Sequence, residues 1–166
     1  MRHPATYLLL ITTTAALSGC GVKSETPAAT EQPAATAPAP DTTAAPTSTS
    51  PYDTGPRAGS QAINAGMAGK GEKLFASKGC VVCHGFGKVI TCPDLVGVSM
   101  RRTAMWMEEQ ILHPEVMVKQ DPISRELRTH YSLPMTNQGL TPDQARSIIE
   151  FLKQKDHAAG AKPVSK

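Results

Sequence analysis

Five consecutive residues, Cys80-Val81-Val82-Cys83-His84, hold the most distinctive chemistry in this sequence. C-x-x-C-H is the attachment signature of a c-type haem. The two-residue spacing lets one backbone turn bring both thiols to neighbouring vinyl groups of the porphyrin, and the adjoining imidazole then lies beneath the ring plane. We therefore predict one covalent haem c, with thioether bonds to Cys80 and Cys83 and with His84 as an axial ligand of the iron.

C-x-x-C also occurs in thioredoxin-like redox sites and in zinc sites. A thioredoxin-like site needs a βαβ setting, and no alternating, strand-like pattern flanks this motif. A zinc site needs a second pair of Cys or His residues at ligand spacing, whereas His113, His130 and His157 are scattered. Haem attachment therefore fits the pattern best.

An iron atom bound by one histidine either takes a second protein ligand or keeps an open site, and this choice decides function. Met135 follows Leu133-Pro134, and a proline disfavours helix at the residue before it, so we expect an extended loop that presents the Met135 thioether. His130 is the nearest competitor in sequence. The other candidate sulfurs are those of Met67, Met100, Met105, Met107 and Met117. We predict Met135 as the second axial ligand.

Four segments are predicted to be helical. For three of them the start is marked by a capping side chain or by a proline at the first helical position: Thr103, Asp121-Pro122 and Thr141-Pro142-Asp143-Gln144. The expected helices are 67–78, 103–112, 123–131 and 141–155, with His113-Pro114 ending the second of them.

The run Gly71-Glu72-Lys73-Leu74-Phe75, followed by the C-x-x-C-H motif, resembles the N-terminal helix and haem-binding turn of class I c-type cytochromes. The resemblance implies an all-α fold of about four short helices around one haem. It also implies that Gly71 and Phe75 pack against the C-terminal helix, and that the axial methionine precedes that helix, as Met135 does.

The same resemblance implies roles for two further residues. In Cys92-Pro93-Asp94-Leu95, the carbonyl of Pro93 is expected to accept a hydrogen bond from the His84 imidazole, which fixes the ring. Trp106 is expected either near the haem propionates or simply in the core, with its N–H bonded to some acceptor. Cys92 departs from the family pattern of Gly or Asn, and we expect it to be a small buried residue.

The first residues indicate export. Arg2 and His3 precede a short apolar run, and Leu17-Ser18-Gly19-Cys20 resembles the lipobox of bacterial lipoproteins, in which the cysteine is lipidated. This predicts a signal peptide at 1–19 and a lipid anchor on Cys20 at the periplasmic side of a bacterial membrane. The alternative is an ordinary cleaved signal with an incidental cysteine.

The remaining chain divides by composition. Residues 20–65 are rich in Ala, Thr and Pro and predict a disordered linker, because they have too few large apolar side chains to offset ordering entropy. We expect the cytochrome domain at 66–156 and a flexible tail at 157–166.

The formal net charge of +3, with acids and bases mixed along the chain, does not indicate a nucleic-acid binder. A haem with two protein ligands has no open site, so we expect a monomeric, non-enzymatic carrier that takes single electrons from one redox protein to another. Two alternatives stay open. The first is a labile-ligand haem protein, a gas sensor or small enzyme with His130 nearby; the second is a fixed subunit of a respiratory complex, such as one serving denitrification.

Overall fold

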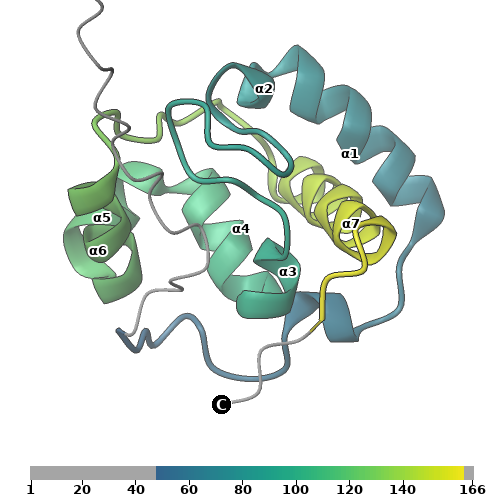
Figure 1. Ribbon diagram of the computed structural model, residues 1–166, viewed down its shortest axis with the longest axis horizontal. Coiled ribbons are helices and arrows are strands. Elements are labelled where there is room, and N and C mark those ends of the chain that lie inside the picture. Colours follow the sequence, from purple (N-terminus) through teal and green to yellow (C-terminus); the bar gives the residue numbers. More distant parts are fainter. Residues whose placement is uncertain (1–47, 163–166) are drawn as a thin grey trace, which may run out of the picture. The chain divides into compact units, whose positions relative to one another are not determined.

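The computed structural model describes residues 48–162, and over this range it is all-helical apart from two isolated antiparallel bridges (Figure 1). The helices are η1 (Ala58–Ser60), α1 (Ala65–Ser77), α2 (Cys80–Cys83), α3 (Val98–Arg101), α4 (Ala104–Leu112), α5 (Pro114–Gln120), α6 (Pro122–His130) and α7 (Pro142–Ala158). The predicted all-α class is confirmed. Within the described range no helix combines the length and apolar character needed to cross a membrane.

Helices α1 and α7 pack directly against each other (Figure 1). Gly71 lets the two backbones approach closely, because a β-carbon at this position would overlap the carbonyl of Ser147 on α7. One turn further along, the ring of Phe75 lies 5.4 Å from that of Phe151, centroid to centroid. Phe86 completes an aromatic cluster, 5.5 Å from Phe75. The helix packing implied by the family resemblance is therefore present.

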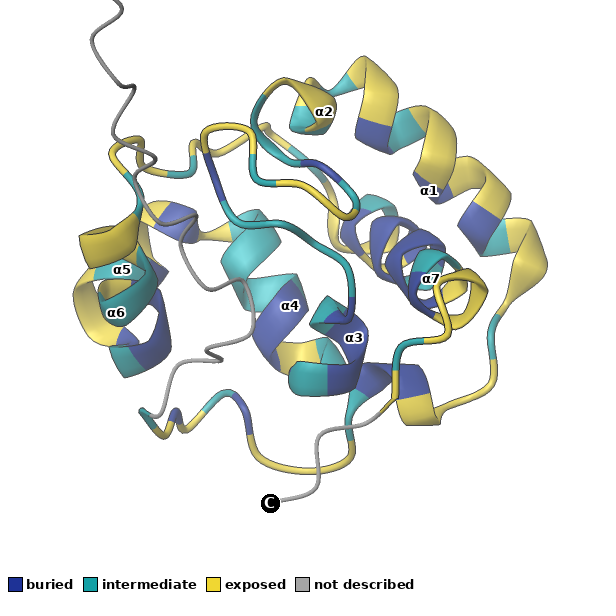
Figure 2. Ribbon diagram, viewed as in Figure 1, coloured by how far each residue is buried: buried dark blue, intermediate teal, exposed yellow. Residues whose placement is uncertain are grey.

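Buried residues recur along most of the length of α7 (Figure 2). Ala145, Ile148, Ile149 and Leu152 recur at spacings of three and four, which places them on one side of the helix. They share the hydrophobic core with buried residues of α1, α4, α5 and α6, among them Phe75, Trp106, Met107, Met117 and Ile123.

The predicted helix starts are confirmed by their capping bonds. Thr103 accepts a hydrogen bond from Trp106 N–H, and the Asp121 carboxylate accepts one from Ser124 N–H. Thr141 and Gln144 form a reciprocal capping box at α7. These starts are local in sequence, so the pattern alone was sufficient to find them.

Helix α5 was not predicted. His113 ends α4 as expected, but Pro114 occupies the first position of a new helix instead of leading into a loop. A proline is compatible with this position because its missing N–H would have no partner there.

Described residues before the predicted domain start at 66, which the sequence assigned to a linker, make contacts with the helical part of the chain. Asp53 accepts a 2.7 Å hydrogen bond from Thr103 N–H and pairs with Arg57 and Arg102. Ser48 donates to Glu126 of α6 over 2.7 Å. The composition of this segment is that of a linker, but these long-range polar contacts hold it.

The last helix extends past residue 156, where the sequence predicted the domain to end. Helix α7 continues to Ala158, and Nε2 of His157 lies 2.9 Å from the carbonyl oxygen of Gly59. The predicted signal peptide 1–19, the lipidated Cys20, the linker up to residue 47 and the last residues 163–166 lie outside the described part of the chain.

Candidate functional site

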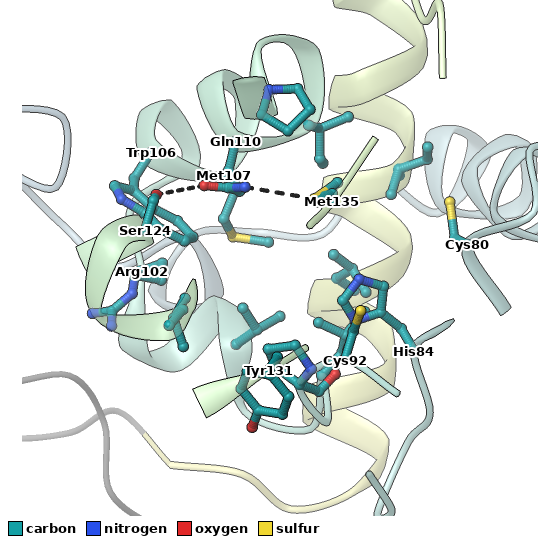
Figure 3. Close-up of a pocket in the computed structure, with 18 of the residues that line it drawn as sticks. Cys80, His84, Cys92, Arg102, Trp106, Met107, Gln110, Ser124, Tyr131 and Met135 are labelled. Atoms are coloured by element: carbon teal, nitrogen blue, oxygen red, sulfur yellow. Dashed lines mark hydrogen bonds between the residues drawn. The ribbon is translucent and has the colours of Figure 1, made fainter. Parts of the chain in front are cut away.

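A cavity of about 210 Å³ opens between α4, α6, α7 and the loops that follow α2 and α6 (Figure 3). Its walls are mainly apolar, with side chains from Phe75, Leu95, Val98, Ile111, Leu127 and Leu152. Cys80, His84 and Met135, which the sequence assigned to haem binding, all line it. The fold thus brings together residues from the motif after α1 and from the loop before α7.

The imidazole of His84 is fixed by the loop that follows it. Nδ1 lies 2.9 Å from the carbonyl oxygen of Pro93, which can only accept, so Nδ1 carries the proton. Nε2 then keeps its lone pair for a metal. Burial lowers the pKa of the imidazole, and the bond to Pro93 opposes this only in part, so the ring is held in its neutral, metal-binding form.

The two motif cysteines form the short helix α2, which His84 ends by leaving helical geometry. Cys80 lines the cavity, and burial raises the pKa of its thiol. Cys83 is half-buried at the end of α2, outside the cavity lining. Both are free thiols, as thioether formation requires. Val81 and Val82 between them are 48% and 70% exposed, so this edge of the site reaches the surface.

Met135 enters the cavity from the loop between α6 and α7, where its sulfur accepts a hydrogen bond from Gln110 Nε2 at 3.6 Å (Figure 3). His130 is exposed at the end of α6 and does not line the cavity. Of the other methionines considered, Met107 lines it, but this side chain is 3% exposed and belongs to the core of α4. Met135 is therefore the best-placed loop sulfur.

Trp106 also lines the cavity, but its N–H is already used. Nε1 donates to Oδ1 of Asp121 over 3.1 Å, so the indole N–H has an internal acceptor, while a position of the ring near the propionates stays a prediction. Burial raises the pKa of Asp121, but hydrogen bonds from Ser50, Ser124 and Trp106 outweigh burial and hold the pKa below its ordinary value.

Two arginines at the cavity were not singled out in the sequence. Arg101 and Arg102 both line it, and Arg102 also stacks 5.2 Å over the Trp106 ring. Burial lowers the pKa of both guanidinium groups, while the nearby carboxylates of Asp156 and Asp53 oppose that shift. A pair of adjacent arginines carries no specific signal in a sequence, because such pairs also occur in ordinary surface loops. Only the fold shows that Arg101 and Arg102 line the cavity.

Cys92 lies in the cavity wall beside His84 (Figure 3). Its side chain is 4% exposed, as expected for a small buried residue. Burial, and after it the neighbouring Cys83, raise the pKa of its thiol, which favours the protonated form.

These residues fit a covalently bound haem. The cavity offers apolar walls for a flat ring, the free thiol of Cys80 with that of Cys83 nearby on α2, a neutral imidazole with an available Nε2, a thioether, and two cations suited to propionates. Because Nδ1 of His84 is already bonded to the Pro93 carbonyl, Nε2 is the ring nitrogen whose lone pair can bind a metal.

Comparison with known proteins agrees with this chemistry. The cytochrome c from Rhodothermus marinus is 32% identical, with a TM-score of 0.56 over 58% of this chain and 83% of its own. Its engineered form Rma TDE is 31% identical, with a TM-score of 0.56 over 58% of this chain and 84% of that one. Rma TDE bound to a carbene intermediate matches at 31% identity and a TM-score of 0.53.

No curated protein matches the sequence. The family model for cytochrome c matches residues 68–156, which is more than half of the chain. The match includes the C-x-x-C-H motif, the Pro93 loop and Met135. The chain therefore belongs to the cytochrome c family, as a class I c-type cytochrome with one covalently bound haem c.

Proposed function

We propose that this cytochrome is a one-electron carrier, not an enzyme, with His84 and Met135 as the two axial ligands. The observation that carries the proposal is that both side chains line one apolar cavity, with His84 oriented by Pro93. The bound haem supplies reversible one-electron chemistry at its iron. With two protein ligands, no position is left for a substrate, which favours electron transfer over bond-making.

The protein residues set the conditions for this transfer. The Pro93 carbonyl holds the His84 ring and increases its basicity, while the apolar side chains keep water from the site. The turn that carries Cys80 and Cys83 reaches the surface, because Val81 and Val82 between them are exposed to solvent. Redox proteins that donate and accept electrons are proposed to meet the molecule at this edge through a small, short-lived contact.

We further propose that the carrier is a lipoprotein on the periplasmic side of a bacterial membrane. The support comes from the Leu17-Ser18-Gly19-Cys20 pattern and from the Ala/Thr/Pro-rich stretch after it. An anchored, monomeric head of this kind would carry electrons from a respiratory donor to a periplasmic reductase or oxidase.

The ligand proposal is tested by absorption spectra of the oxidised and reduced holoprotein, with and without carbon monoxide. Met135→Ala should lose the sulfur-to-iron band of the oxidised form and should bind carbon monoxide, whereas the wild type should ignore it. Met105→Ala is the matched control, because Met105 is 47% exposed on α4 and does not line the cavity.

The opposite result would favour another function. If the wild type binds carbon monoxide readily and Met135→Ala has an unchanged spectrum, Met135 is not a ligand. The labile-ligand alternative, a gas sensor or small haem enzyme, would then replace the electron carrier.

A further inference from the structure

The thiol of Cys92 lies next to that of Cys83, one of the two haem-attachment cysteines. The backbone N–H of Cys92 donates to the carbonyl of Cys83 over 3.1 Å. Burial is the main cause of the raised pKa of Cys92, and Cys83 adds to it through its charge and through a hydrogen bond between the two side chains. In Figure 3 the side chain of Cys92 lies beside the imidazole of His84, the residue that follows Cys83. A third thiol is thus within reach of the attachment motif.

The segment between these two cysteines folds back on itself through local contacts. His84 and Val89 form an antiparallel bridge. Gly85 allows the close approach, because a β-carbon there would overlap the carbonyl oxygen of Lys88. Thr91 N–H also donates to the carbonyl of Cys83, over 3.4 Å. These contacts join neighbours in the chain, so the turn that brings Cys83 to Cys92 can form before haem is attached.

The backbone geometry at Cys83 and Cys92 suits a disulfide. Residues joined across an antiparallel pair have α-carbons about 4.5–5.5 Å apart, and a disulfide needs about 4.4–6.8 Å. Both thiols are free in the structure. A loop this short also closes at a low cost in chain entropy. A bond between the two sulfurs therefore requires little movement of the main chain.

Cys80 is the other thiol near Cys83, at the start of α2. Burial and, to a smaller extent, the charge on Cys83 raise the pKa of the Cys80 thiol. Cys83 thus acts on Cys80 through charge, and on Cys92 through charge and a hydrogen bond between the side chains. The backbone bond to Cys92 adds to this difference, so the geometry favours Cys92 as the partner of Cys83.

We propose that Cys83 and Cys92 form a reversible disulfide in the chain before haem is attached, and that this bond withholds Cys83 from the haem until a thiol reductant opens it. A thioether forms when the S–H group of a cysteine adds across a vinyl group, and a sulfur in a disulfide has no S–H to add. The bond would also protect Cys83 from irreversible oxidation to the sulfinic acid. The proposal does not depend on ligation by Met135.

The bond forms by thiol–disulfide exchange with an external disulfide as the oxidant, either a small molecule or a protein. The half-buried Cys83 attacks first, which gives a mixed disulfide and releases one external thiol. The buried Cys92 then attacks the Cys83 sulfur and releases the second external thiol. Two protein thiols are thereby oxidised and one external disulfide is reduced, and the two protons pass to the released thiols. An added thiol reductant reverses both steps.

The test uses the full chain without haem, treated with oxidised glutathione, alkylated and digested with trypsin. Cleavage after Lys78, Lys88 and Arg101 leaves Cys80 and Cys83 in the peptide 79–88 and Cys92 in the peptide 89–101. A Cys83–Cys92 disulfide joins these two peptides, whereas a Cys80–Cys83 disulfide stays within the first and makes it lighter by two hydrogens. We expect the joined pair as the main product by mass spectrometry.

A matched digest separates a preferred pairing from random pairing. The share of Cys92 in the joined peptides should be at least about threefold higher in native buffer than in guanidinium chloride, where loop length alone decides which thiols meet. The holoprotein should give no joined pair, because its Cys83 sulfur is in a thioether. Equal shares in the two buffers would overturn the proposal.

Single variants of the haem-free chain identify the partner of Cys92. Cys80→Ala should keep the joined pair after oxidation, and Cys83→Ala should lose it. In oxidised Cys80→Ala, Cys83 should not react with iodoacetamide, and dithiothreitol should restore the reaction. In Cys80→Ala/Cys92→Ala, Cys83 should instead carry glutathione as a mixed disulfide. A joined pair that persists in Cys83→Ala, or that is missing from Cys80→Ala, would overturn the assignment of Cys83 and Cys92 as partners.

Discussion

The α-carbon of Gly71 on α1 faces the backbone carbonyl of Ser147 on α7 so closely that no side chain fits between them. The contact sets the distance between the two helices that frame the haem motif, because α1 leads directly into Cys80. Glycine is required here by space and not by backbone angle, since Gly71 lies inside a regular helix.

Gly71→Ala should destabilise the domain by about 2–4 kcal/mol, since an overpacked contact against backbone cannot relax by rotating a side chain. Gly69→Ala on the same helix is the matched control. Gly69 has open space around its α-carbon, so alanine should stabilise the helix there by about 0.5–1 kcal/mol. Urea unfolding of both holoprotein variants measures the difference, and equal stabilities would contradict the close approach of α1 and α7.

Helix starts and the haem motif were predictable from the sequence because each depends on neighbours in the chain. Thr141 and Gln144 cap each other within three residues, and C-x-x-C-H is a contiguous motif. The contact between Gln110 and Met135 was not predictable, because the two residues are 25 positions apart in the sequence and meet only in the folded domain.

The segment before α1 escaped prediction for the same reason. Asp53 finds Thr103 50 residues along the chain, and the amine of Lys153 donates to the carbonyl of Ala62 at a separation of 91 residues. Composition reports how much apolar surface a segment can bury, but it does not show where a few polar groups find partners.

Asp121→Ala should lower the free energy of unfolding by about 2–4 kcal/mol, because it leaves the buried N–H groups of Trp106 and Ser124 without an acceptor. The free energy of unfolding of the wild type at acid pH should depend on the same Asp121 carboxyl group. The pKa of Asp121 is held below its ordinary value of 3.8, so its contribution is complete above that pH and is lost as the pH falls through the lower, folded-state pKa.

Unfolding curves from pH 2 to 5 measure this effect. Asp121→Ala should show a weaker pH dependence than the wild type in that range, since the variant lacks the group that takes up the proton on unfolding. Identical pH profiles would mean that Asp121 has the same pKa in the folded and in the unfolded protein.

Cys92 should resist alkylation in the folded holoprotein, because it is buried and its thiol pKa is raised. Iodoacetamide followed by peptide mass spectrometry should label Cys92 only after unfolding in guanidinium chloride. Cys92→Ala should cost about 1 kcal/mol of stability and keep the spectrum of the wild type. Rapid labelling under native conditions would instead identify an accessible, reactive thiol.

Cys20→Ser should move the cytochrome from the membrane fraction to the soluble fraction of the cell, because it removes the proposed acylation site. Haem staining of the fractions measures this, with Cys92→Ser as a control that changes a cysteine of the folded domain. A Cys20→Ser protein that stays in the membrane fraction would exclude a lipid anchor at this position.

Asp53→Ala should destabilise the domain by about 2–4 kcal/mol, because it leaves Thr103 N–H unpaired and removes the partner of Arg57 and Arg102. Thr54→Ala is a suitable control, since Thr54 is exposed and makes only a local bond to Pro51. Thermal unfolding of the two variants measures the difference, and equal melting temperatures would mean that the segment contributes little.

The contacts of Ser48 and Asp53 also decide how the domain bears mechanical load. A force applied to the chain at Ser48 would act first on the Ser48–Glu126 hydrogen bond. It would act next on the ion pairs of Asp53 with Arg57 and Arg102. These contacts lie ahead of α1 in the chain, so tension would pass to α6 and to the junction of α3 and α4 before it reached the helix that leads into the haem motif. A force applied at Ser48 would therefore load these contacts before it reached the haem motif.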